Sequence, residues 1–348
     1  MPSVSAIVLA WRDEPVLEEA VHALLASTAD GTGLAGGLDV DVVVVDNGCT
    51  SEAVRNLADL PGVSVVDPGE NLGFAAGCNR GARTARGEYL AFVNGDAVVR
   101  PDALARMVLA AQAEDVGLVT ASVRLYDDPE TINSAGNPVH YLGLSWAGGL
   151  GEPAAAHARP ADVASASGAA TVCRADRFAA LDGFCEPMFA YCEDTELSLR
   201  SWQRGWRVVY EPTAVVTHRY EFSRNPQKLY LVERNRLILV LTVFPRRLLA
   251  VVAAPLLALE VAMLAMSARD GWWRQKVAGW RWLLANAGTL RERRRWVQAQ
   301  RRDDHGFTGL LTGDVTPGVD GLSIPPVLRR LSVAFWSLAR RTVREVSP

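Results

Sequence analysis

Residues 40–46 read Val-Asp-Val-Val-Val-Val-Asp, an almost continuous valine run. A strand of this composition is typical of a parallel sheet that is covered on both faces. Strands are also expected at residues 4–9 and 63–66, with helices over about residues 14–26 and through Leu57 between the strands. This β-α-β-α-β order predicts an α/β fold with right-handed crossovers and a doubly wound, mostly parallel sheet flanked by helices.

A fourth strand is expected at residues 89–93, a short apolar run of aromatic and branched side chains. It ends in Asn94, Gly95 and Asp96, after which Pro101 begins an amphipathic helix. Open α/β sheets bind their ligands outside the carboxyl ends of the strands. Asp96 can hold a divalent cation there, and Asn94 can add a neutral oxygen. Asn, Gly and Asp are also common turn residues. The segment alone therefore does not decide between a turn and a metal site.

Composition argues against several classes of protein. The net charge of −3 over 348 residues is unlike that of a nucleic-acid-binding protein, which usually has a basic face. The five cysteines are scattered, and no pair has the spacing of a zinc ribbon, so we expect them to be reduced and buried. The first residues lack a basic region and run into a strand-like segment, so no signal peptide is expected.

A glycine-rich segment at residues 70–81 precedes the fourth strand. Closely spaced glycines before a short helix let the backbone approach a phosphate or a ribose. The spacing differs from that of the dinucleotide-binding fingerprint, and no G-x-x-x-x-G-K-[ST] motif occurs, so P-loop chemistry is not expected.

From residue 126 to 166 the pattern gives way to Pro, Gly, Ala and Asn. A loop of this length is usually functional or mobile. The segment is interpreted as a region that covers the substrate, with a structural linker as the alternative.

Glu193, Asp194 and Glu196 gather at the start of a helix. The helix dipole favours acidic residues in a first turn, which is one explanation. The other is that a carboxylate at this position serves as a general base. A strand expected at residues 207–210 is followed by His218, and a single histidine is more often structural than a ligand, although histidine is a common metal ligand.

A set of short segments occurs in a fixed order over about residues 4–240. The segments are Val43–Ser51, Asn71–Gly81, Tyr89–Asp96, Ser167–Ala170, Asp182–Phe184, Phe189–Arg200 and Glu233–Arg236. Their order and spacing resemble those of the family 2 glycosyltransferases with the GT-A fold, especially the bacterial rhamnosyltransferase-like branch. The resemblance implies a nucleotide-sugar donor, a dTDP- or UDP-sugar with dTDP-rhamnose expected first, and transfer with inversion. It also implies Mg2+ or Mn2+ at the leaving diphosphate.

The resemblance also implies roles for particular residues. Asp194, with Glu193 beside it, matches the catalytic base, and Asp96 and His218 match the metal ligands. The residues expected to contact or line the donor site are Ala10, Trp11, Asp46, Gly73, Asn79, Asn94, Arg234 and Arg236.

Two positions depart from the family pattern. The first strand ends in Ala10, Trp11 and Arg12, where the family often has Thr-Tyr-Asn, and Trp11 can still stack on a nucleobase. Asn94 replaces the first acid of the D-x-D motif and removes one negative charge from the metal site. Mg2+ often keeps waters and substrate phosphates as ligands, so Asp96 alone can supply the protein carboxylate.

The resemblance assigns residues 1–240 to a GT-A catalytic domain. Within it, residues 1–100 form the nucleotide-sugar-binding half and residues 101–240 the acceptor and catalytic half. Residues 241–348 are expected to form a helical, basic, membrane-associating region.

That region contains an apolar stretch, residues 248–268, long enough to span a bilayer, although Pro255 and Glu260 interrupt it. Arginines flank both ends, which does not suit a single crossing. We therefore expect a re-entrant or in-plane hairpin and a peripheral or monotopic protein at the cytoplasmic face of the cell membrane. Trp273 with nearby basic residues, and a basic amphipathic stretch at residues 327–346, favour this interpretation. Soluble helices packed on the catalytic domain are the alternative.

The sequence therefore predicts an enzyme that passes a sugar to a lipid-linked or cell-envelope glycan acceptor. One alternative is a nucleotidyltransferase that forms nucleotide-sugars, but residues 10–13 do not resemble the glycine-rich, lysine-bearing phosphate loop of that class. The other is an inactive membrane scaffold that binds a nucleotide-sugar, which the departures at Trp11, Arg12 and Asn94 motivate.

Overall fold

The computed structural model describes residues 1–219, 227–302, 307–315 and 325–344. Through their contacts they form two compact units. The first contains residues 1–137, 147–201 and the segment from Trp206 to the end of a strand at His218. The second contains residues 138–146, 202–205 and the described residues from 227 onward. The predicted domain boundary at residue 240 stays a prediction.

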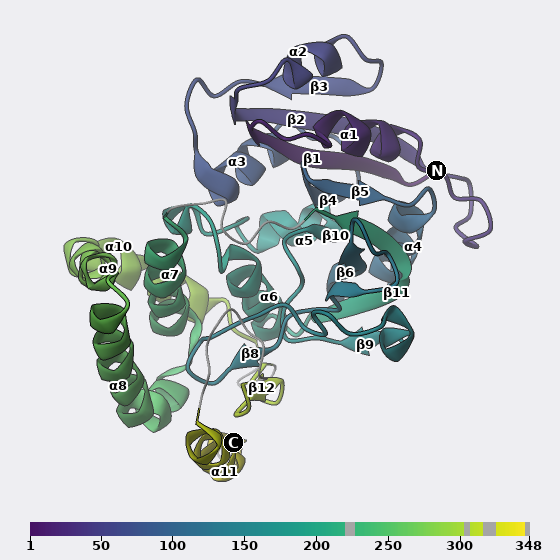
Figure 1. Ribbon diagram of the computed structural model, residues 1–348. Helices are drawn as coiled ribbons and strands as arrows, with labels where there is room; N and C mark the ends of the chain where they lie inside the picture. The colour runs from purple at the N-terminus through teal and green to yellow at the C-terminus, as the bar shows by residue number, and fades with distance from the viewer. Residues whose placement is uncertain (220–226, 303–306, 316–324, 345–348) are drawn as a thin grey trace. The chain divides into compact units, whose positions relative to one another are not determined.

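A mostly parallel sheet forms the centre of the first unit (Figure 1), and the predicted α/β fold class is confirmed. Its strand order is β3-β2-β1-β4-β10-β6-β11-β5. β1 lies parallel to β2 and β4, β2 to β3, and β6 to β11, whereas β10 runs antiparallel between β4 and β6. The strands are β1 (Ser3–Arg12), β2 (Asp39–Cys49), β3 (Val63–Val66), β4 (Tyr89–Asn94), β5 (Ala97–Val99), β6 (Val116–Leu125), β10 (Ala170–Arg174) and β11 (Arg207–His218).

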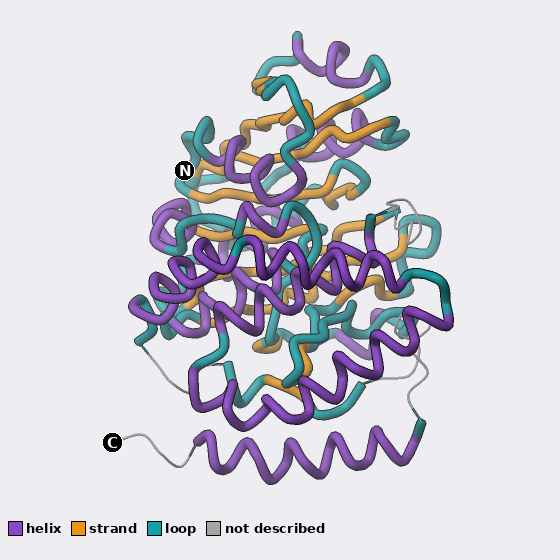
Figure 2. Tube along the Cα trace, turned by 90° about the vertical axis from the view of Figure 1, so that its left-hand side faces the viewer, coloured by secondary structure: helices purple, strands orange, loops and turns teal. Residues whose placement is uncertain are grey.

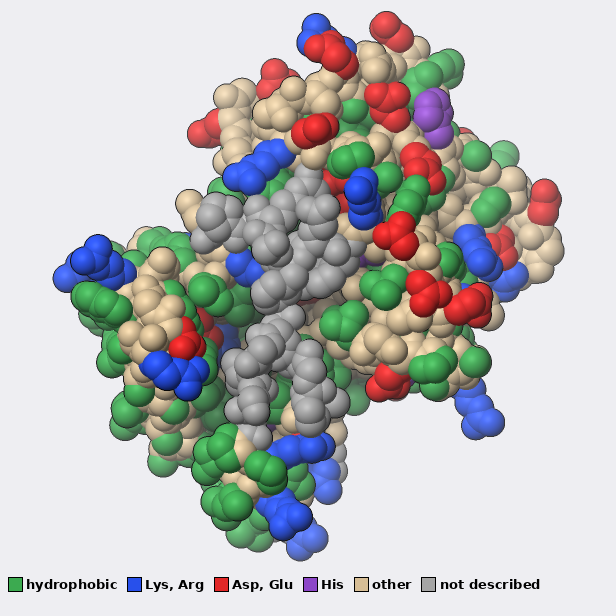
Figure 3. Space-filling model, viewed as in Figure 1, with side chains coloured by type: hydrophobic (Ala, Val, Ile, Leu, Met, Phe, Trp, Pro, Cys, Tyr) green, Lys and Arg blue, Asp and Glu red, His purple; other side chains and the backbone are tan. Residues whose placement is uncertain are grey.

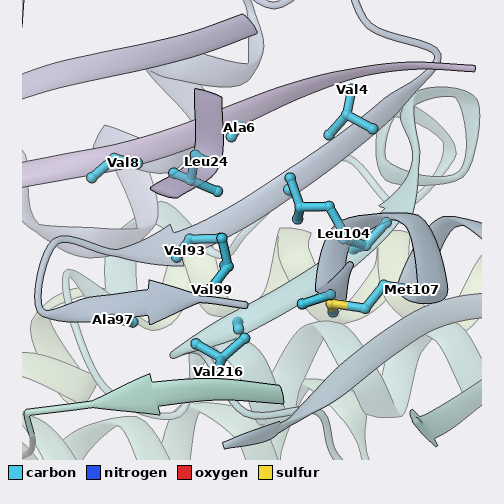
Figure 4. Packing of buried hydrophobic residues seen from close by; sticks show 14 of the residues in the cluster. Val4, Ala6, Val8, Leu24, Val93, Ala97, Val99, Leu104, Met107 and Val216 are labelled. Carbon is cyan, nitrogen blue, oxygen red and sulfur yellow. The ribbon is translucent and has the colours of Figure 1, made fainter. Parts of the chain in front are cut away.

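Helices cover both faces of this sheet because alternate side chains of each strand point to opposite faces. On one face, Val4 and Val8 of β1 join a buried cluster with α1 (Leu17–Leu25) and α4 (Ala103–Ala111), as Figure 4 shows. On the other face, α3 (Gly73–Ala82) approaches Ile7 so closely that a Cβ atom on Gly81 would lie 2.6 Å from it. This arrangement is that of a doubly wound sheet.

The region predicted as a loop over residues 126–166 contains short ordered elements. In the first unit these are β7 (Ile132–Ser134), which pairs with β6, a 3-10 helix (Ala154–His157) and β9 (Ala161–Asp162), which pairs with β11. Each is too short to show a periodic pattern in the sequence. The other helices of this unit are α2 (Ala53–Ala58), α5 (Ala175–Ala180), a 3-10 helix (Glu186–Met188) and α6 (Glu193–Gln203).

β11 extends well beyond the predicted strand at residues 207–210. Its pairing with β6 shifts register between Glu211 and Val215, where Pro212 cannot donate a hydrogen bond to the sheet. After this irregularity the strand continues to His218 and pairs antiparallel with β5. The strand therefore carries His218 to the carboxyl edge of the sheet.

Helices make up most of the second unit (Figure 2). They are α7 (Lys228–Val243), α8 (Arg246–Arg269), α9 (Trp273–Ala285), α10 (Ala287–Ala299) and α11 (Pro326–Arg344). The predicted stretch at residues 327–346 extends two residues outside the described part of the chain. A small parallel pair, β8 (Val139–His140) and β12 (Leu311–Thr312), also belongs to this unit.

Aromatic packing and hydrogen bonds dock α11 on the β8–β12 pair. The rings of Tyr141 and Trp336 stack with centroids 5.1 Å apart, and the Trp336 indole donates to the carbonyl oxygen of Leu311 at 2.8 Å. The Ser332 hydroxyl donates to the carbonyl oxygen of Gly313 at 2.7 Å. One face of this amphipathic helix is thus occupied within its own unit.

The helices α8 and α11 also expose large apolar side chains. Leu257 and Val261 on α8 are 67% and 63% exposed, and Leu331 and Leu338 on α11 are 60% and 69% exposed. Figure 3 shows hydrophobic side chains gathered over these two helices, with Lys and Arg side chains among them. Within the described residues, α8 is the one helix whose length and composition would allow it to cross a membrane.

Candidate active site

The carboxyl ends of three parallel strands bring predicted site residues to one edge of the sheet. In the pairing register, Ala10 of β1 lies opposite Asp46 of β2, and Leu9 of β1 lies opposite Asn94 of β4. Asp46 and Asn94 therefore flank the end of β1, the edge where sheets of this type bind their ligands. The Ala10 side chain is fully buried, so a donor could contact only its backbone.

The last residues of β2 fix the carboxylate of Asp46. Its Oδ1 atom accepts the backbone N–H groups of Gly48 and Cys49 at 3.2 and 2.9 Å. This is the local pattern by which aspartate stabilises a turn. Asp46 therefore holds the irregular end of β2 and presents an oriented carboxylate there.

Asn47, which the sequence interpretation did not select, joins the end of β2 to the glycine-rich segment. Its side chain is buried, donates to the carbonyl oxygen of Gly73 at 3.1 Å and accepts the N–H of Leu72 at 2.8 Å. Both hydrogen-bonding groups of the amide are thus used to hold the start of α3. Its place next to Asp46, at the end of a valine-rich strand, was the available signal in the sequence.

Trp11 lies at an irregularity where the pairing of β1 with β2 shifts between Ala10 and Arg12. Arg12 has a φ of 57°, and its guanidinium lies 4.3 Å from the centroid of the Trp11 ring. This is a cation–π contact. A stacking partner of Trp11 must therefore use the other face of the ring or replace Arg12, and Arg12 adds a positive charge at this strand end.

Asp96 and His218 form a direct pair. The Nε2 atom of His218 lies 3.1 Å from Oδ1 of Asp96, and both side chains are largely buried. Pairing of Ala97 with His218 between β5 and β11 fixes this approach, and the Arg219 N–H donates to the carbonyl oxygen of Asp96 at 2.9 Å. The structure therefore unites the two predicted metal ligands.

A second residue missed in the sequence, Asn133 of β7, orients the histidine ring. Its Oδ1 atom lies 3.0 Å from Nδ1 of His218, and Asn94 Nδ2 lies 3.4 Å from Nε2. With Nδ1 donating to Asn133, the lone pair of Nε2 points at the Asp96 carboxylate. A cation bound between these two atoms would use the lone pairs of both.

The pair therefore fits a divalent cation. Adjacent ligands on an octahedral ion with bonds of about 2.1 Å lie about 3 Å apart, which is close to the observed separation. No group of three or more His, Cys, Asp or Glu that could hold a metal occurs in the part of the chain that the structure describes. A cation would thus have two ligands from this pair and take the others from substrate phosphate and water.

Asp194, the predicted base, is held in one orientation. Its Oδ2 atom accepts the Gly168 N–H at 3.0 Å, and its Oδ1 atom accepts the Thr195 N–H at 2.6 Å. Burial raises the pKa of Asp194, and the hydrogen bonds from Thr195 and Gly168 oppose that rise. The structure also explains the Ser167–Gly168 motif, because Gly168 supplies one of the two backbone donors.

Glu193 differs from Asp194 in its surroundings. It is 6% exposed, and its Oε2 atom is buried with no hydrogen-bond partner among the described residues. Burial raises the pKa of Glu193 well above its ordinary value, and the negative charge of Asp194 raises it further. Glu193 therefore holds a proton more strongly than Asp194, and the pair favours a single negative charge on Asp194.

The segment before these two acids has an unusual backbone. Phe189, Tyr191 and Cys192 have φ values of 66°, 70° and 68°. Positive φ is uncommon for residues other than glycine, costs of order 1–3 kcal/mol each, and is concentrated at functional sites. The Ala75 N–H, in α3, donates to the carbonyl oxygen of Phe189 at 3.0 Å, so the glycine-rich segment helps to hold this backbone.

The side chain of Asn79 forms hydrogen bonds within the protein. Its Oδ1 atom accepts the Phe184 N–H at 2.8 Å, and its Nδ2 atom donates to the Phe184 carbonyl oxygen at 2.9 Å. A Cβ atom on Gly183, whose φ is 62°, would lie 2.5 Å from Asn79. These contacts give Asn79 a structural role in the Asp182–Phe184 turn, and its contact with a donor stays a prediction.

Arg234 and Arg236 belong to the second unit. The Arg234 guanidinium lies 4.6 Å from the Trp282 ring centroid, and Arg236 is buried and paired with Glu233 and Glu260. Lys276 also pairs with both glutamates, and the Trp280 indole donates to Glu260 at 2.7 Å. The contacts of Arg236 are those of a buried ion-pair cluster, and a role of either arginine toward diphosphate stays a prediction.

The sheet order, the acidic strand ends and the separately held carboxylate define the chain as an α/β protein of the GT-A class. The model described as "Glycosyl transferase family 2" matches residues 5–178, half of the chain. The chain therefore belongs to glycosyl transferase family 2.

The chain is also similar to curated proteins over part of their length. "Succinoglycan biosynthesis protein ExoO" of Rhizobium meliloti (strain 1021) is 29% identical over 143 residues, which cover 37% of this chain and 38% of that protein. "Uncharacterized protein y4gI" of Sinorhizobium fredii is 28% identical over 236 residues, covering 64% and 25%. "Uncharacterized glycosyltransferase EpsJ" of Bacillus subtilis is 28% identical over 122 residues, covering 34% and 33%. The chain thus spans between a quarter and two fifths of their lengths.

Solved structures share the fold at low sequence identity. GalNAc-T7, solved with UDP, GalNAc and Mn2+, has a TM-score of 0.58 and 16% identity, with 72% of this chain and 50% of that chain covered. Residues 1–349 of S. aureus TarS, in complex with UDP-GlcNAc, have a TM-score of 0.53 and 15% identity, with 99% and 90% covered. These likenesses support the fold and no finer property.

Proposed function

We propose that this chain is an inverting glycosyltransferase that moves a sugar from a nucleotide-diphosphate donor to a hydroxyl group of a glycan acceptor. The observation that carries the proposal is the Asp194 carboxylate, which the backbone N–H groups of Gly168 and Thr195 hold in one orientation. Membership of glycosyl transferase family 2 supports the reaction class.

In the proposed step, Asp194 removes the proton from the acceptor hydroxyl. Its burial and raised pKa make it a stronger base than an exposed aspartate. The acceptor oxygen forms a bond to the anomeric carbon while the bond from that carbon to the diphosphate breaks. A single displacement from the opposite face inverts the configuration and requires no nucleophilic residue. Glu193, which retains its proton, leaves the negative charge on Asp194.

The leaving diphosphate needs positive charge. Asp96 and His218 would hold a divalent cation, Mg2+ or Mn2+, which when bound neutralises the diphosphate as a Lewis acid. Asn133 orients the His218 ring for this purpose, and Asn94 lies beside it with an amide in place of a carboxylate. GalNAc-T7, which shares the fold, was solved with Mn2+, which agrees with the proposal.

Asp46 and Trp11 are proposed to contact the nucleobase end of the donor. Asp46 has an oriented carboxylate, and Trp11 offers an aromatic face at the neighbouring strand end. We propose a dTDP- or UDP-sugar, with rhamnose as the first sugar to test. UDP and UDP-GlcNAc accompany the two solved structures described above, so a donor panel should include uridine nucleotides.

The acceptor is proposed to be a lipid-linked or cell-envelope glycan. One relative is described as a succinoglycan biosynthesis protein. The exposed apolar side chains of α8 and α11 support attachment of the second unit to a membrane, with the enzyme at its cytoplasmic face. An in-plane position suits α11, whose other face is docked on β8 and β12.

Donor consumption in the presence of extracted lipid acceptor tests the transfer reaction. Asp194→Asn is expected to lower kcat by about 10²–10⁴-fold, because the base is lost while the side chain keeps its size. Asp96→Ala is expected to abolish the dependence on added Mg2+ or Mn2+ together with most of the rate. The exposed Asp59→Asn makes the same change of charge away from the site and should leave the rate unchanged.

Retention of full transfer by both site variants would overturn the assignment. Release of pyrophosphate from a nucleoside triphosphate and a sugar phosphate would instead identify a nucleotidyltransferase. Calorimetric binding of the donor panel without hydrolysis or transfer would identify an inactive nucleotide-sugar-binding protein.

A further inference from the structure

The guanidinium of Arg294, on α10, is only partly satisfied. Its Nη1 atom donates to the carbonyl oxygens of Leu241 and Phe244 at 2.6 and 2.9 Å. Its Nη2 atom is buried and has no hydrogen-bond partner among the residues that the structure describes. A buried donor without a partner costs roughly 1–3 kcal/mol, and native proteins contain few such groups. The free donor therefore indicates a ligand that accepts hydrogen bonds.

The charges around Arg294 point to an anionic ligand. Burial lowers the pKa of Arg294, and the positive charges of Arg246 and Arg301 lower it further. Arg246 and Arg247 occupy the first turn of α8, which contains no acidic residue. The helix dipole favours an anion at this end, so the arginines and the dipole create positive potential together.

Capping of α7 explains only part of this arrangement. Arg294 donates to carbonyl groups at the carboxyl end of α7, where a cation is favourable. That role needs neither Arg246 nor Arg301. Gln298 also donates to the carbonyl oxygen of Val243 at 2.8 Å, so the helix end has another donor. Capping accounts for Nη1 of Arg294 and leaves its Nη2 atom unsatisfied within the described part of the chain.

The acidic residues of the two helices do not neutralise the cluster. The acid of α10, Glu292, is two positions before Arg294, and residues at that spacing do not face each other on a helix. The acid of α8, Glu260, pairs with Arg236 and Lys276 instead. Neither helix thus supplies a carboxylate for the free donor.

We propose that Arg246, Arg294 and Arg301 form a binding site for a phosphate group. Planar guanidinium groups match phosphate oxygens with paired, charge-assisted hydrogen bonds. The phosphate can belong to an anionic phospholipid, since Arg246 begins the exposed apolar helix α8, or to free phosphate in solution. The site consists of residues of the second unit and does not rest on the proposed transfer reaction.

Two measurements on the full chain separate these sources. In the first, flotation compares vesicles of phosphatidylcholine with vesicles that also contain phosphatidylglycerol. In the second, thermal unfolding follows added inorganic phosphate at constant ionic strength, because a bound ligand raises the unfolding temperature by mass action. The site variant is Arg246→Gln with Arg301→Gln, which leaves the α7 cap of Arg294 in place. The matched control is Arg281→Gln with Arg291→Gln, an equal loss of charge at two exposed arginines.

For a lipid phosphate, the site variant loses at least several-fold in binding to the anionic vesicles, while the control variant binds like the unchanged chain. For free phosphate, the phosphate-dependent rise in unfolding temperature disappears in the site variant alone. Either result supports the site. Equal behaviour of the site and control variants in both measurements overturns it, since charge alone would then explain the binding.

Discussion

The backbone of Gly73 lies so close to Phe189 that a Cβ atom at position 73 would be 2.5 Å from both the ring Cδ2 atom and the carbonyl oxygen of Phe189. Gly73 belongs to the segment expected to line the donor site, and Phe189 opens the strained backbone that leads to Asp194. The contact links two parts of the proposed site that are more than a hundred residues apart in the chain. We therefore expect Gly73 to position the proposed base.

Gly73→Ala is expected to lower kcat by roughly ten- to a hundredfold, because small misplacements of a catalytic group carry losses of this size. The new methyl group must displace Phe189 and the backbone that follows it. Gly69→Ala is the matched control, since Gly69 has the same φ of 76° but no atom of the other described residues lies within 4 Å of the added Cβ atom. Both variants carry the backbone strain, and only Gly73→Ala should show the large loss in steady-state kinetics. Equal losses in kcat would show that the contact with Phe189 does not position the base.

The local sequence pattern was sufficient to predict several polar residues at the carboxyl edge of the sheet. The valine run of β2 and the apolar run of β4 stop near the carboxyl ends of these strands, and Asp46, Asn94 and Asp96 come just after the runs. Asn47 and Asn133 could not be selected in this way. Their roles depend on contacts with Gly73 and His218, residues distant in the chain, and an isolated asparagine predicts only a turn.

The backbone conformation near the proposed site also could not be predicted from the sequence. The positive φ values of Phe189 and Tyr191 contradict the local preference of aromatic residues, so no propensity argument predicts them. The extension of β11 past Pro212 was likewise hidden, since proline normally ends a central strand. These exceptions lie beside the residues proposed to carry the chemistry, where local rules are expected to fail.

Asn133→Ala is expected to weaken Mn2+ binding by about 10–100-fold, the usual effect of losing a partner that orients a metal-binding histidine. His218→Ala should weaken it at least as much, because it removes the ligand itself. Free Mn2+ can be counted by electron paramagnetic resonance without any transfer assay. His157→Ala removes a histidine that pairs with Glu152 away from Asp96 and should leave binding unchanged. Unchanged Mn2+ binding in both site variants would remove His218 and its partner Asn133 from the proposed metal site.

Glu193→Gln is expected to stabilise the protein at neutral pH. The folded state holds the proton on Glu193 more strongly than the unfolded state, whose glutamate has an ordinary pKa of 4.5. The contribution of Glu193 to the free energy of unfolding is fully present below this ordinary pKa. It is lost as the pH rises toward the raised pKa of the folded state. The largest slope is about 1.4 kcal/mol per pH unit. The amide keeps the shape and cannot ionise.

Urea unfolding at about pH 5 and about pH 8 measures this effect, because both pH values lie above the ordinary pKa of glutamate. The free energy of unfolding of the variant should exceed that of the unchanged chain by more at the higher pH. The exposed Glu70→Gln serves as the control and should show no such difference. A stability difference that does not change with pH would mean that Glu193 is ionised in the folded state.

Glu260→Ala is expected to destabilise the chain by about 3–5 kcal/mol, the cost of breaking a buried ion pair by removing one partner. In the sequence this residue only interrupts an apolar stretch, whereas in the structure it pairs with Arg236 and Lys276. The loss leaves Glu233 as the remaining carboxylate for both cations. Because these partners belong to the protein rather than to lipid, vesicles should not restore the stability. Glu292→Ala removes an exposed acid of α10 and should change the unfolding temperature little. An equal effect of the two substitutions would show that the buried pairs do not hold α7, α8 and α9 together.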